Sequence, residues 1–292
     1  MANRDSPRRS RARAPADLQA HIDKALALSG QTKTHHSYRM AKLMFDPQLL
    51  YIERIDKKRP SLFVGNHGIY GFEGGFLPSA IREHTGMLPR LLTHSDVMLS
   101  RFEDSLMNMG LVLANREVCR ALMEAGESIL VFPGGAREGA KCRGEQYQLF
   151  WEGRTGFVQM ALEHGFTITP VATVGPDEMW DIRWDSNDFA NTPIASLLRR
   201  LFPDSFDPEL VPPLLPKGLF GTIVPRPERF YIAFGEPFDT LPYAGSEGVE
   251  SVLNEIKQSV QSQLEELIKE ALLERARRSG EVHWFRRLLT RH

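Results

Sequence analysis

The chain has 292 residues, of which 42% are hydrophobic, so it is long enough to bury a sizeable core in one principal domain. The formal net charge is −1, but residues 1–14 and 274–292 each carry +4, which leaves about −9 for the part between them. Basic ends on an acidic body argue against a broad nucleic-acid-binding face, and two cysteines, Cys119 and Cys142, make neither a disulfide framework nor a metal-site pattern, which fits a reducing cytosol.

The N-terminal residues 1–15 predict a disordered basic tail. The start, "MANRDSPRRSRARAPADL", is rich in Arg and is followed by no apolar stretch, so it is not a secretory signal. A membrane-spanning helix needs about 18 or more apolar residues, and the sequence has no such run. We therefore expect a cytoplasmic protein that does not cross a membrane.

Strand-like and helical segments alternate through the middle of the chain. "SLFVGN", "SILVF" and "TITPVATV" are short apolar runs typical of buried strands. Between them, "NREVCRALMEAGE" and "TGFVQMALEHG" have helical periodicity, and Asn115 suits the start of the first helix as Gly165 suits the end of the second. This alternation predicts an α/β fold with a mixed, mostly parallel central sheet flanked by helices. Pro170 lies within the third strand, and its missing backbone donor predicts a sheet edge or a bulge there.

The rest of the chain divides into three segments. Residues 177–228 are irregular and rich in Pro, Trp and Asp, which is more typical of a functional or covering excursion than of an idle loop. Apolar residues at three- and four-residue steps predict one long covering helix over about 247–279. We therefore expect a single domain over residues 16–280, followed by a basic amphipathic tail at 281–292. That tail suits either a membrane interface or packing against the domain, and both interpretations stay open.

The first two strands end in polar loops. His67 follows the first strand, and "PGGAREGA" follows the second. Ligands of open α/β sheets bind beyond the carboxyl ends of the strands, so we expect His67 and Arg137 to lie near each other if the two strands are parallel neighbours. A neutral imidazole can take a proton from a hydroxyl, and a carboxylate can orient the ring. Glu73 is the nearest candidate, provided that the chain bends at Gly68 and Gly71.

The residues alone leave the roles of these side chains open. A histidine in a loop is as compatible with a hydrogen-bonded structural residue as with a catalytic base. Gly134 and Gly135 allow backbone N–H groups to approach an anion, and Arg137 can hold a carboxylate, a phosphate or an oxyanion, but an ordinary tight turn has the same sequence. Arg116 is a second candidate, or else an ion-pair partner of a neighbouring glutamate.

Four blocks stand in order along the chain: "GNHGIYGFEG", Gly110 with Arg116, "FPGGAR", and Pro170 with Val171. Together they resemble the glycerolipid acyltransferase superfamily, and within it the branch of type-2 diacylglycerol acyltransferases and plant phytyl ester synthases. The resemblance covers about residues 60 to 240, and "VPRPERFYIAFGEPFDT" extends the likeness to that branch. Gly134 and Ala136 stand where phospholipid-making relatives have Glu and Thr.

The resemblance implies an O-acyltransferase in which His67 is the catalytic base and Glu73 orients it. It also implies that Arg137, with the Gly134 and Gly135 backbone, holds the oxyanion or the donor's phosphates, and that Arg116 positions a substrate. The expected donor is acyl-CoA as co-substrate, with acyl carrier protein as an alternative, and no metal or other cofactor is expected. The two departures from the phospholipid-making pattern favour a neutral alcohol or glycerolipid as the acceptor.

Three alternative functions stay open, besides membrane contact by the C-terminal tail. They are a lysophospholipid or glycerol-phosphate acyltransferase, an acyl thioesterase, and a lipid-binding membrane protein without catalysis. The chain lacks a GxSxG nucleophile elbow, which argues against a serine hydrolase. If the tail contacts a membrane, the expected place is peripheral, on its inner face.

Overall fold

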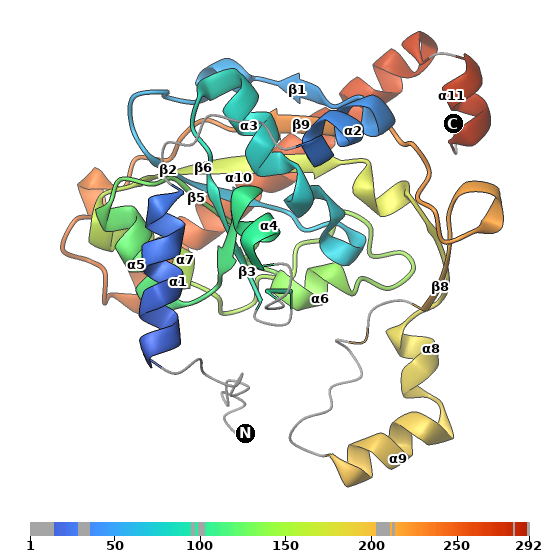
Figure 1. Ribbon diagram of the computed structural model, residues 1–292, viewed down its shortest axis with the longest axis horizontal. Coiled ribbons are helices and arrows are strands. Elements are labelled where there is room, and N and C mark those ends of the chain that lie inside the picture. Colours follow the sequence, from blue (N-terminus) through green and yellow to red (C-terminus); the bar gives the residue numbers. More distant parts are fainter. Residues whose placement is uncertain are drawn as a thin grey trace.

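The computed structural model describes residues 15–28, 36–94, 97–98, 103–202, 211, 214–282 and 284–290. Figure 1 shows these residues as a central sheet with helices around it and a small lobe that carries α8 and α9. The basic tail predicted for residues 1–15 lies outside the described residues except for Pro15, at which the first helix begins.

In the described part of the chain, seven strands form one sheet in the order β1-β9-β6-β2-β5-β3-β4. Strands β2 to β6 run parallel, while β9 is antiparallel to β6 and parallel to β1. The prediction of a mixed, mostly parallel sheet is therefore confirmed. The strands are β1 (Gln48–Leu50), β2 (Ser61–Gly65), β3 (Arg90–Thr93), β4 (Leu111–Leu113), β5 (Ile129–Val131), β6 (Thr167–Val174) and β9 (Tyr231–Phe234), and a separate pair is β7 (Asp181–Trp184) with β8 (Leu214–Lys217).

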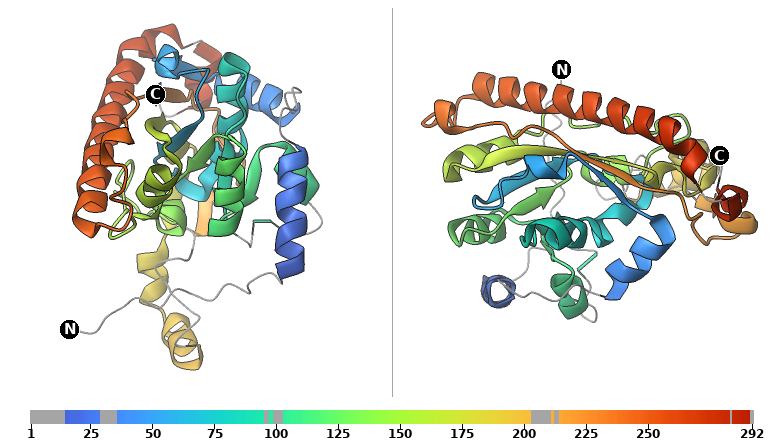
Figure 2. Two further views of the ribbon diagram at one scale, coloured as in Figure 1. Left: turned by 90° about the vertical axis from the view of Figure 1, so that its left-hand side faces the viewer. Right: turned by 90° about the horizontal axis from the view of Figure 1, so that it is seen from above.

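Two of the predicted helices have the caps that the sequence indicated, and the long helix expected over about 247–279 covers 250–277. The Asn115 side chain accepts hydrogen bonds from the N–H groups of Glu117 and Val118 at the start of α5, and Gly165 ends α7 in the left-handed conformation. The long helix α10 covers one face of the sheet together with α7, and α3 lies on the other face (Figure 2). The helices are α1 (Pro15–Ala27), α2 (His36–Phe45), α3 (Leu77–Thr85), α4 (Glu103–Asn108), α5 (Arg116–Glu124), α6 (Gly135–Gly139), α7 (Gly156–His164), α8 (Ser186–Ala190), α9 (Pro193–Leu201), α10 (Glu250–Arg277) and α11 (Trp284–Leu289).

Pro170 does not lie at an edge of the sheet. Its strand, β6, has β2 on one side and β9 on the other, so the edge alternative was wrong. The β6–β9 ladder is interrupted opposite Pro170: it runs to Val171 opposite Phe234 and resumes at Ile168 opposite Phe238, with one more residue on the second strand. The missing N–H of proline therefore falls where the ladder has a bulge, which is the alternative that the structure supports.

The irregular segment after β6 forms a lobe. Strands β7 and β8 pair in antiparallel orientation, and the long connection between them contains α8 and α9 (Figure 1). The lobe leaves the sheet at the carboxyl end of β6, directly after Asp177 and Glu178. It therefore begins at the end of the sheet where the candidate site lies.

Candidate functional site

The buried side chain of Asn66 fixes the chain where β2 ends. Its Nδ2 donates to the Thr173 carbonyl at 2.9 Å, and its Oδ1 accepts from the Thr173 N–H at 2.8 Å. The amide thus pairs with β6 as one more peptide group of the ladder would. Because the side chain takes over this pairing, the backbone is free to leave the sheet at His67.

His67 and Glu73 meet at the carboxyl end of β2. The distance between His67 Nδ1 and Glu73 Oε1 is 2.5 Å, and the Gly68 N–H donates to the same oxygen at 3.1 Å. The six-residue separation closes because Tyr70 and Gly71 adopt positive φ angles of 62° and 67°, which bend the chain back on itself. The predicted bend is therefore present at Gly71, with Tyr70 as its second residue, whereas Gly68 is extended and does not take part in it. The bend brings the two side chains into contact.

The Glu73 carboxylate is completely buried, while the His67 side chain keeps 21% of its surface exposed. Burial raises the pKa of Glu73, but attraction to His67 and hydrogen bonds from His67 and Gly68 outweigh it, so the net pKa lies below its ordinary value. The second oxygen, Oε2, accepts no hydrogen bond from the residues that the structure describes. The carboxylate is therefore held as an anion that faces the imidazole.

The imidazole of His67 lies between an aromatic ring and a glycine. Phe132 stacks on it, with ring centroids 4.5 Å apart and an angle of 7° between the planes. A Cβ on Gly71 would lie 2.4 Å from Cε1 and 2.9 Å from Nε2, so a side chain there would collide with the ring. Among the described residues, Nε2 makes no hydrogen bond. The ring is thus held in place with one nitrogen available.

The loop after β5 supplies a buried carboxylate to the His67 backbone. Glu138 Oε2 accepts from the His67 N–H at 2.8 Å, and Oε1 accepts from the Phe150 N–H at 2.9 Å. Burial raises the pKa of Glu138, although these N–H groups and Lys141 act in the opposite direction. A Cβ on Gly134 would lie 2.0 Å from the Glu138 Cδ. Glycine at position 134 therefore leaves the space that the Glu138 carboxylate fills.

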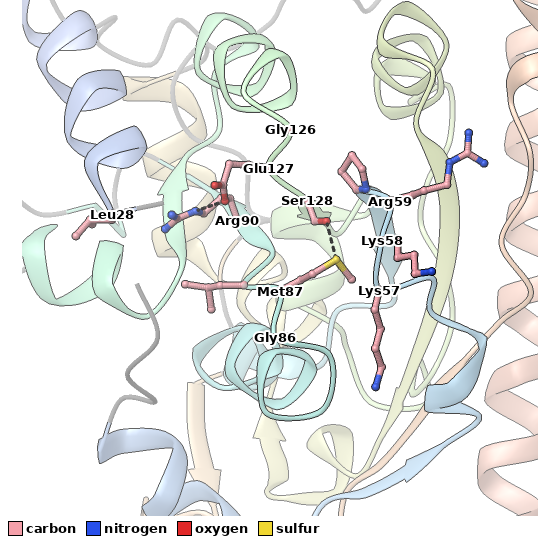
Figure 3. Close-up of a pocket in the computed structure, with 12 residues that line it drawn as sticks. Leu28, Lys57, Lys58, Arg59, Gly86, Met87, Arg90, Gly126, Glu127 and Ser128 are labelled. Atoms are coloured by element: carbon pink, nitrogen blue, oxygen red, sulfur yellow. Dashed lines mark hydrogen bonds and ion pairs between the residues drawn. The ribbon is translucent and has the colours of Figure 1, made fainter. Parts of the chain in front are cut away.

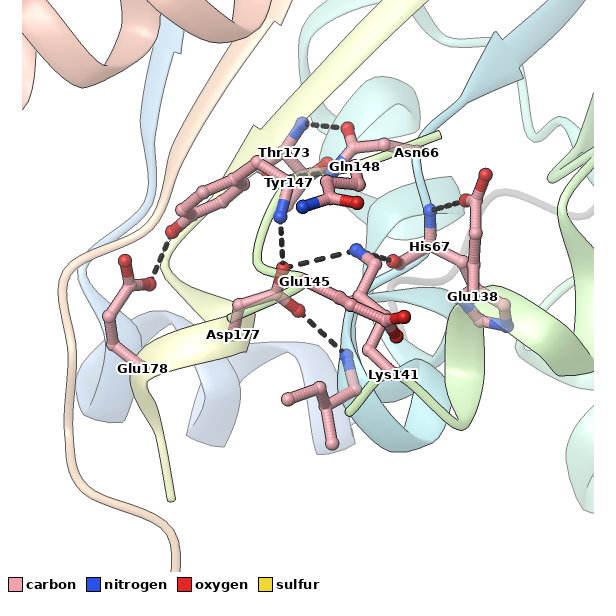
Figure 4. Close-up of polar contacts among 12 residues, drawn as sticks. Asn66, His67, Glu138, Lys141, Glu145, Tyr147, Gln148, Thr173, Asp177 and Glu178 are labelled. Carbon is pink, nitrogen blue, oxygen red and sulfur yellow. Dashed lines mark hydrogen bonds and ion pairs between the residues drawn. The ribbon is translucent and has the colours of Figure 1, made fainter. Parts of the chain in front are cut away.

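Lys141 and Asp177 form a buried ion pair beside the same loop (Figure 4). Lys141 Nζ donates to the His67 carbonyl at 2.7 Å and to Asp177 Oδ2 at 3.1 Å. Asp177 Oδ1 accepts from the Ile69 N–H at 2.9 Å. Both the N–H and the carbonyl of His67 are therefore held by ionisable side chains that the chain supplies far along the sequence.

The other candidate residues lie apart from the His67 ring contacts. Arg137 donates to both oxygens of Glu145, at 2.9 and 2.6 Å, and lies over the Phe150 ring. Arg116 pairs with Glu163 at 2.7 Å, rather than with a neighbouring glutamate of its own helix. The Gly135 N–H donates to the Phe132 carbonyl within the turn, so it is already engaged.

The apolar residues on either side of Glu73 do not form one common surface. Phe76 and Leu77 are buried in the core, while Phe72 is exposed. Phe76 and Leu77 therefore serve core packing. A separate pocket of about 260 Å³ lies between α5 and α7 and includes Arg116 with Leu62, Cys119 and Met160.

Sequence reasoning missed Asn66, Phe132, Glu138, Lys141 and Asp177. Two signals were available: Glu138 and Lys141 are charges within the same glycine-rich loop as Arg137, and Asp177 follows the carboxyl end of the third strand. Nothing in the sequence indicates that the first two turn inward while Arg137 turns toward Glu145. That choice depends on which backbone groups of the neighbouring loop need partners.

The opposite end of the sheet holds a different polar pocket, of about 230 Å³ (Figure 3). Arg90 lies there at the amino end of β3 and pairs with Glu127, and Lys57, Lys58 and Arg59 lie on the loop before β2. Since His67 follows the carboxyl end of β2, this pocket is not part of the candidate site.

Two further kinds of feature are absent from the described ranges. No group of three or more His, Cys, Asp or Glu side chains is arranged to hold a metal ion. None of the described helices combines the length and the apolar character that a membrane span requires.

Comparison with known proteins identifies similar chains. A family model described as diacylglycerol acyltransferase matches residues 74–239, and His67 and Glu73 come directly before that match. Phytyl ester synthase 1 of Arabidopsis thaliana is 30% identical over 236 residues, which cover 74% of this chain and 33% of that protein. Diacylglycerol O-acyltransferase 2 of Dictyostelium discoideum is 27% identical over 217 residues, 69% of this chain and 63% of that protein.

A solved structure is also similar. The crystal structure of a 1-acyl-sn-glycerophosphate acyltransferase from Thermotoga maritima aligns with 84% of this chain and 78% of that one, at 15% identity and a TM-score of 0.43. The chain spans about a third of the length of the phytyl ester synthase and less than two thirds of the Dictyostelium enzyme. Because the family model matches more than half of its residues and a 30% identical relative covers 74% of it, the chain belongs to the diacylglycerol acyltransferase family.

Proposed function

We propose that this chain is an O-acyltransferase that moves a fatty acyl group from an acyl thioester to a hydroxyl group. Membership of the diacylglycerol acyltransferase family supports this class of reaction. The observation that carries the proposal is the 2.5 Å contact between His67 Nδ1 and the buried Glu73 carboxylate, since it leaves Nε2 of an oriented imidazole to act as a base.

In the proposed reaction, His67 Nε2 takes the proton from the acceptor hydroxyl while the oxygen attacks the thioester carbonyl carbon. The tetrahedral intermediate then collapses, the C–S bond breaks, and the imidazolium returns the proton to the departing thiolate. The products are an ester and a free thiol. Glu73 stays ionised throughout and stabilises the imidazolium, which the lowered pKa of its carboxyl group favours.

The proposed acceptor is a neutral alcohol or glycerolipid. Three carboxylates, Glu73, Glu138 and Asp177, lie around the His67 loop with Lys141 as the cation among them. A phosphorylated acceptor bound next to Nε2 is repelled by this excess of negative charge. Similar chains named phytyl ester synthase and diacylglycerol O-acyltransferase also favour an uncharged acceptor over lysophosphatidate.

The proposed donor is acyl-CoA, with acyl carrier protein as the alternative, and no metal enters the proposed chemistry. Arg137 is proposed to bind the donor's phosphate or the oxyanion, a role in which the anion replaces Glu145 as its partner. Arg116 lines the 260 Å³ pocket between α5 and α7 and is proposed to position a substrate there. Gly134 is proposed to contribute its backbone to the donor site, whereas Gly135 contributes the shape of the turn.

The proposed location is the cytoplasm, with peripheral contact to the inner face of a membrane through residues 281–292. The test is to delete residues 281–292 and measure sedimentation with anionic vesicles, which we expect to weaken. Unchanged sedimentation would count against a role of this tail.

The proposed activity is tested by incubating the pure protein with labelled acyl-CoA and a panel of neutral and phosphorylated alcohols, read by mass spectrometry. We expect a labelled ester of a neutral alcohol that forms only when the alcohol is present. Free fatty acid without any ester would instead indicate a thioesterase. Ester formation with the phosphorylated acceptors alone would indicate the lysophospholipid or glycerol-phosphate acyltransferase alternative.

A further inference from the structure

Helix α9 turns its apolar side toward solvent. Ile194, Leu197 and Leu201 recur at three- and four-residue steps, so they lie on one side of the helix, and each is 56 to 62% exposed. Ala195 faces the other way and is buried. An amphipathic helix at a protein surface normally buries its apolar side, so the reversed orientation indicates a surface that meets something apolar.

The turn after β8, residues 218–224, presents further apolar side chains at its tip. Phe220 is 84% exposed and Ile223 is 77% exposed. The turn is nevertheless held firmly: Trp180 Nε1 donates to the Ile223 carbonyl at 2.9 Å, and the Leu219 N–H donates to the Val224 carbonyl at 2.7 Å. The exposed rings and methyl groups are therefore presented by a hydrogen-bonded turn.

Helix α11 is attached to the protein by its polar side. Arg286 Nη1 donates to the carbonyls of Met44 and Pro227, both at 2.7 Å, while Trp284 and Leu288 are 66% and 71% exposed. Packing of the apolar side on the domain, one of the two interpretations of this tail, is therefore wrong for the described residues. The arginine satisfies backbone carbonyls of the body, which leaves the apolar side outward.

These three segments lie at one end of the molecule. The chain enters the lobe from the carboxyl end of β6. Strands β1 and β9 are antiparallel to β6, so their first residues lie at this same end. Helix α11 contacts Met44 and Pro227, which come just before these two strands. In Figure 1 all three segments lie toward the end of the sheet where β6 ends, with α11 at the top of the view, the turn after β8 between, and α9 at the bottom. His67 follows the carboxyl end of β2, which is parallel to β6, so the candidate site opens toward this end.

The charges of the three segments have one sign. Residues 193–201, 217–224 and 284–289 contain no acidic residue, although the whole chain has 37 acidic and 36 basic residues. Their charged residues are Arg199, Arg200, Lys217, Arg286 and Arg287. Arg286 and Arg287 donate to backbone carbonyls of the protein, so Arg199, Arg200 and Lys217 are the ones that can approach headgroups. Exposed apolar side chains flanked by basic ones are complementary to a bilayer that contains anionic lipid, because the first enter the interface and the second approach the headgroups.

We propose that α9, the turn at residues 218–224 and α11 together form a docking face for an anionic lipid bilayer. The face extends beyond the C-terminal tail, and α9 and the turn contribute most of its apolar area. Docking in this orientation brings the carboxyl ends of β2 and β6 toward the bilayer, so an acceptor dissolved in lipid can reach His67. The docking itself does not depend on the proposed acyl transfer.

The test is co-sedimentation with vesicles of phosphatidylcholine, with and without phosphatidylglycerol. We expect binding that requires phosphatidylglycerol and weakens with added salt. The double variants L197D/L201D and F220D/I223D should each bind about tenfold more weakly or worse, because each loses two apolar side chains from the interface.

The matched control is L241D/V249D. Both residues are exposed apolar side chains. They follow β9, which runs antiparallel to β6, so they come after the end of β9 that lies at the amino end of β6. The neighbouring Thr240 confirms this place, because its Oγ1 donates to the Phe166 carbonyl just before β6. They therefore lie at the end of the sheet opposite the docking face. We expect this control to bind vesicles as the unchanged protein does.

Three outcomes would overturn the proposal: an unchanged protein that does not sediment with anionic vesicles, α9 and turn variants that bind as well as the unchanged protein, or a control that weakens equally. Transfer of an acyl group to a short, water-soluble alcohol is measured in parallel. The docking variants should keep this activity, and its absence from all proteins would count against the proposed function without affecting the binding result.

Discussion

Two glycine-containing loops follow neighbouring parallel strands, and they behave differently. The loop after β2 bends sharply, contacts its own Glu73 and leaves His67 Nε2 available. The loop after β5 sends Glu138 and Lys141 inward to the backbone of the first loop and turns Arg137 outward to Glu145. The first loop therefore presents the ionisable ring, and the second fixes where that ring lies.

This difference changes what the second loop contributes. From the sequence, "FPGGAREGAK" was a source of anion-binding groups, with Arg137 as its main member. In the structure, its buried charges act on His67: one accepts from its N–H and another donates to its carbonyl. The loop is thus a support for the proposed base as well as a proposed donor site, and the two roles can be separated by substitution.

Apart from the loss of His67 itself, the largest expected effect is that of Glu73→Gln. The substitution keeps the size of the side chain but removes the negative charge that faces the imidazole, so we expect kcat/KM for acyl transfer to fall about 10²-fold. Glu145→Gln, in the second loop, is the matched control and should lower it far less. Equal losses in both variants would remove the distinction between the loops.

Gly134→Ala tests whether the second loop supports the first. Its Cβ would lie 2.0 Å from the Glu138 Cδ, so the carboxylate must move away from the His67 N–H. We expect a loss of about 1–3 kcal/mol in the free energy of unfolding and about a tenfold loss of kcat/KM. Gly153→Ala, where a Cβ meets no atom within 4 Å, is the control.

The same contact predicts non-additive effects. In the double variant G134A/E138A, the carboxylate that collides with the new Cβ is absent, so the double variant should be little worse than Glu138→Ala alone. Strictly additive losses, measured as kcat/KM and as free energies of unfolding by denaturant, would mean that Gly134 and Glu138 act independently.

The two buried glutamates should respond to pH with opposite signs. The pKa of Glu73 is lowered in the fold, so its stabilising contribution is present above its unfolded pKa of about 4.3 and is lost as the pH falls. The pKa of Glu138 is raised, so its contribution is present below that pKa and is lost as the pH rises. Each contribution is the difference in the free energy of unfolding between the wild type and the corresponding Gln variant.

The measurement is urea unfolding of the wild type, Glu73→Gln and Glu138→Gln between about pH 7 and pH 4. The stability advantage of the wild type over Glu73→Gln should shrink toward low pH, whereas its advantage over Glu138→Gln should grow. Parallel trends for both variants would show that the two carboxylates do not differ in environment.

The smallest expected effect is that of Arg116→Ala. Its ion pair with Glu163 is half exposed, so we expect a change of less than about 0.5 kcal/mol in the free energy of unfolding. If Arg116 positions a substrate, KM should rise while kcat changes little. A large fall in kcat with unchanged KM would assign it to the chemical step instead.

Much of the fold and part of the site could be predicted from the sequence. Apolar runs and helix caps such as Asn115 and Gly165 depend on neighbours within a few residues, and the structure has them as expected. The contact of His67 with Glu73 could be predicted for the same reason, because the two residues are only six positions apart and a glycine-rich bend lies between them. The place of Pro170 was harder to predict, since a residue without a backbone N–H fits a sheet edge and a bulge equally well.

The bracing of His67 could not be predicted, because it depends on long-range contacts. Glu138 and Lys141 are 71 and 74 residues from His67, and Asp177 is 108 residues from Ile69. Which of the charges in "GAREGAK" turns inward is decided by the unpaired backbone groups of another loop. The reversed orientation of α11 has a similar origin, since carbonyls of Met44 and Pro227 attract Arg286.

The role of His67 as the base is tested most directly by the rate at which His67→Ala forms a labelled ester from acyl-CoA and the alcohol that the wild type uses best. The side chain is partly exposed, so the substitution should leave the circular dichroism spectrum unchanged. We expect kcat/KM to fall about 10²- to 10⁴-fold, which is the contribution of a general base. A folded His67→Ala variant that keeps the wild-type rate would contradict this role.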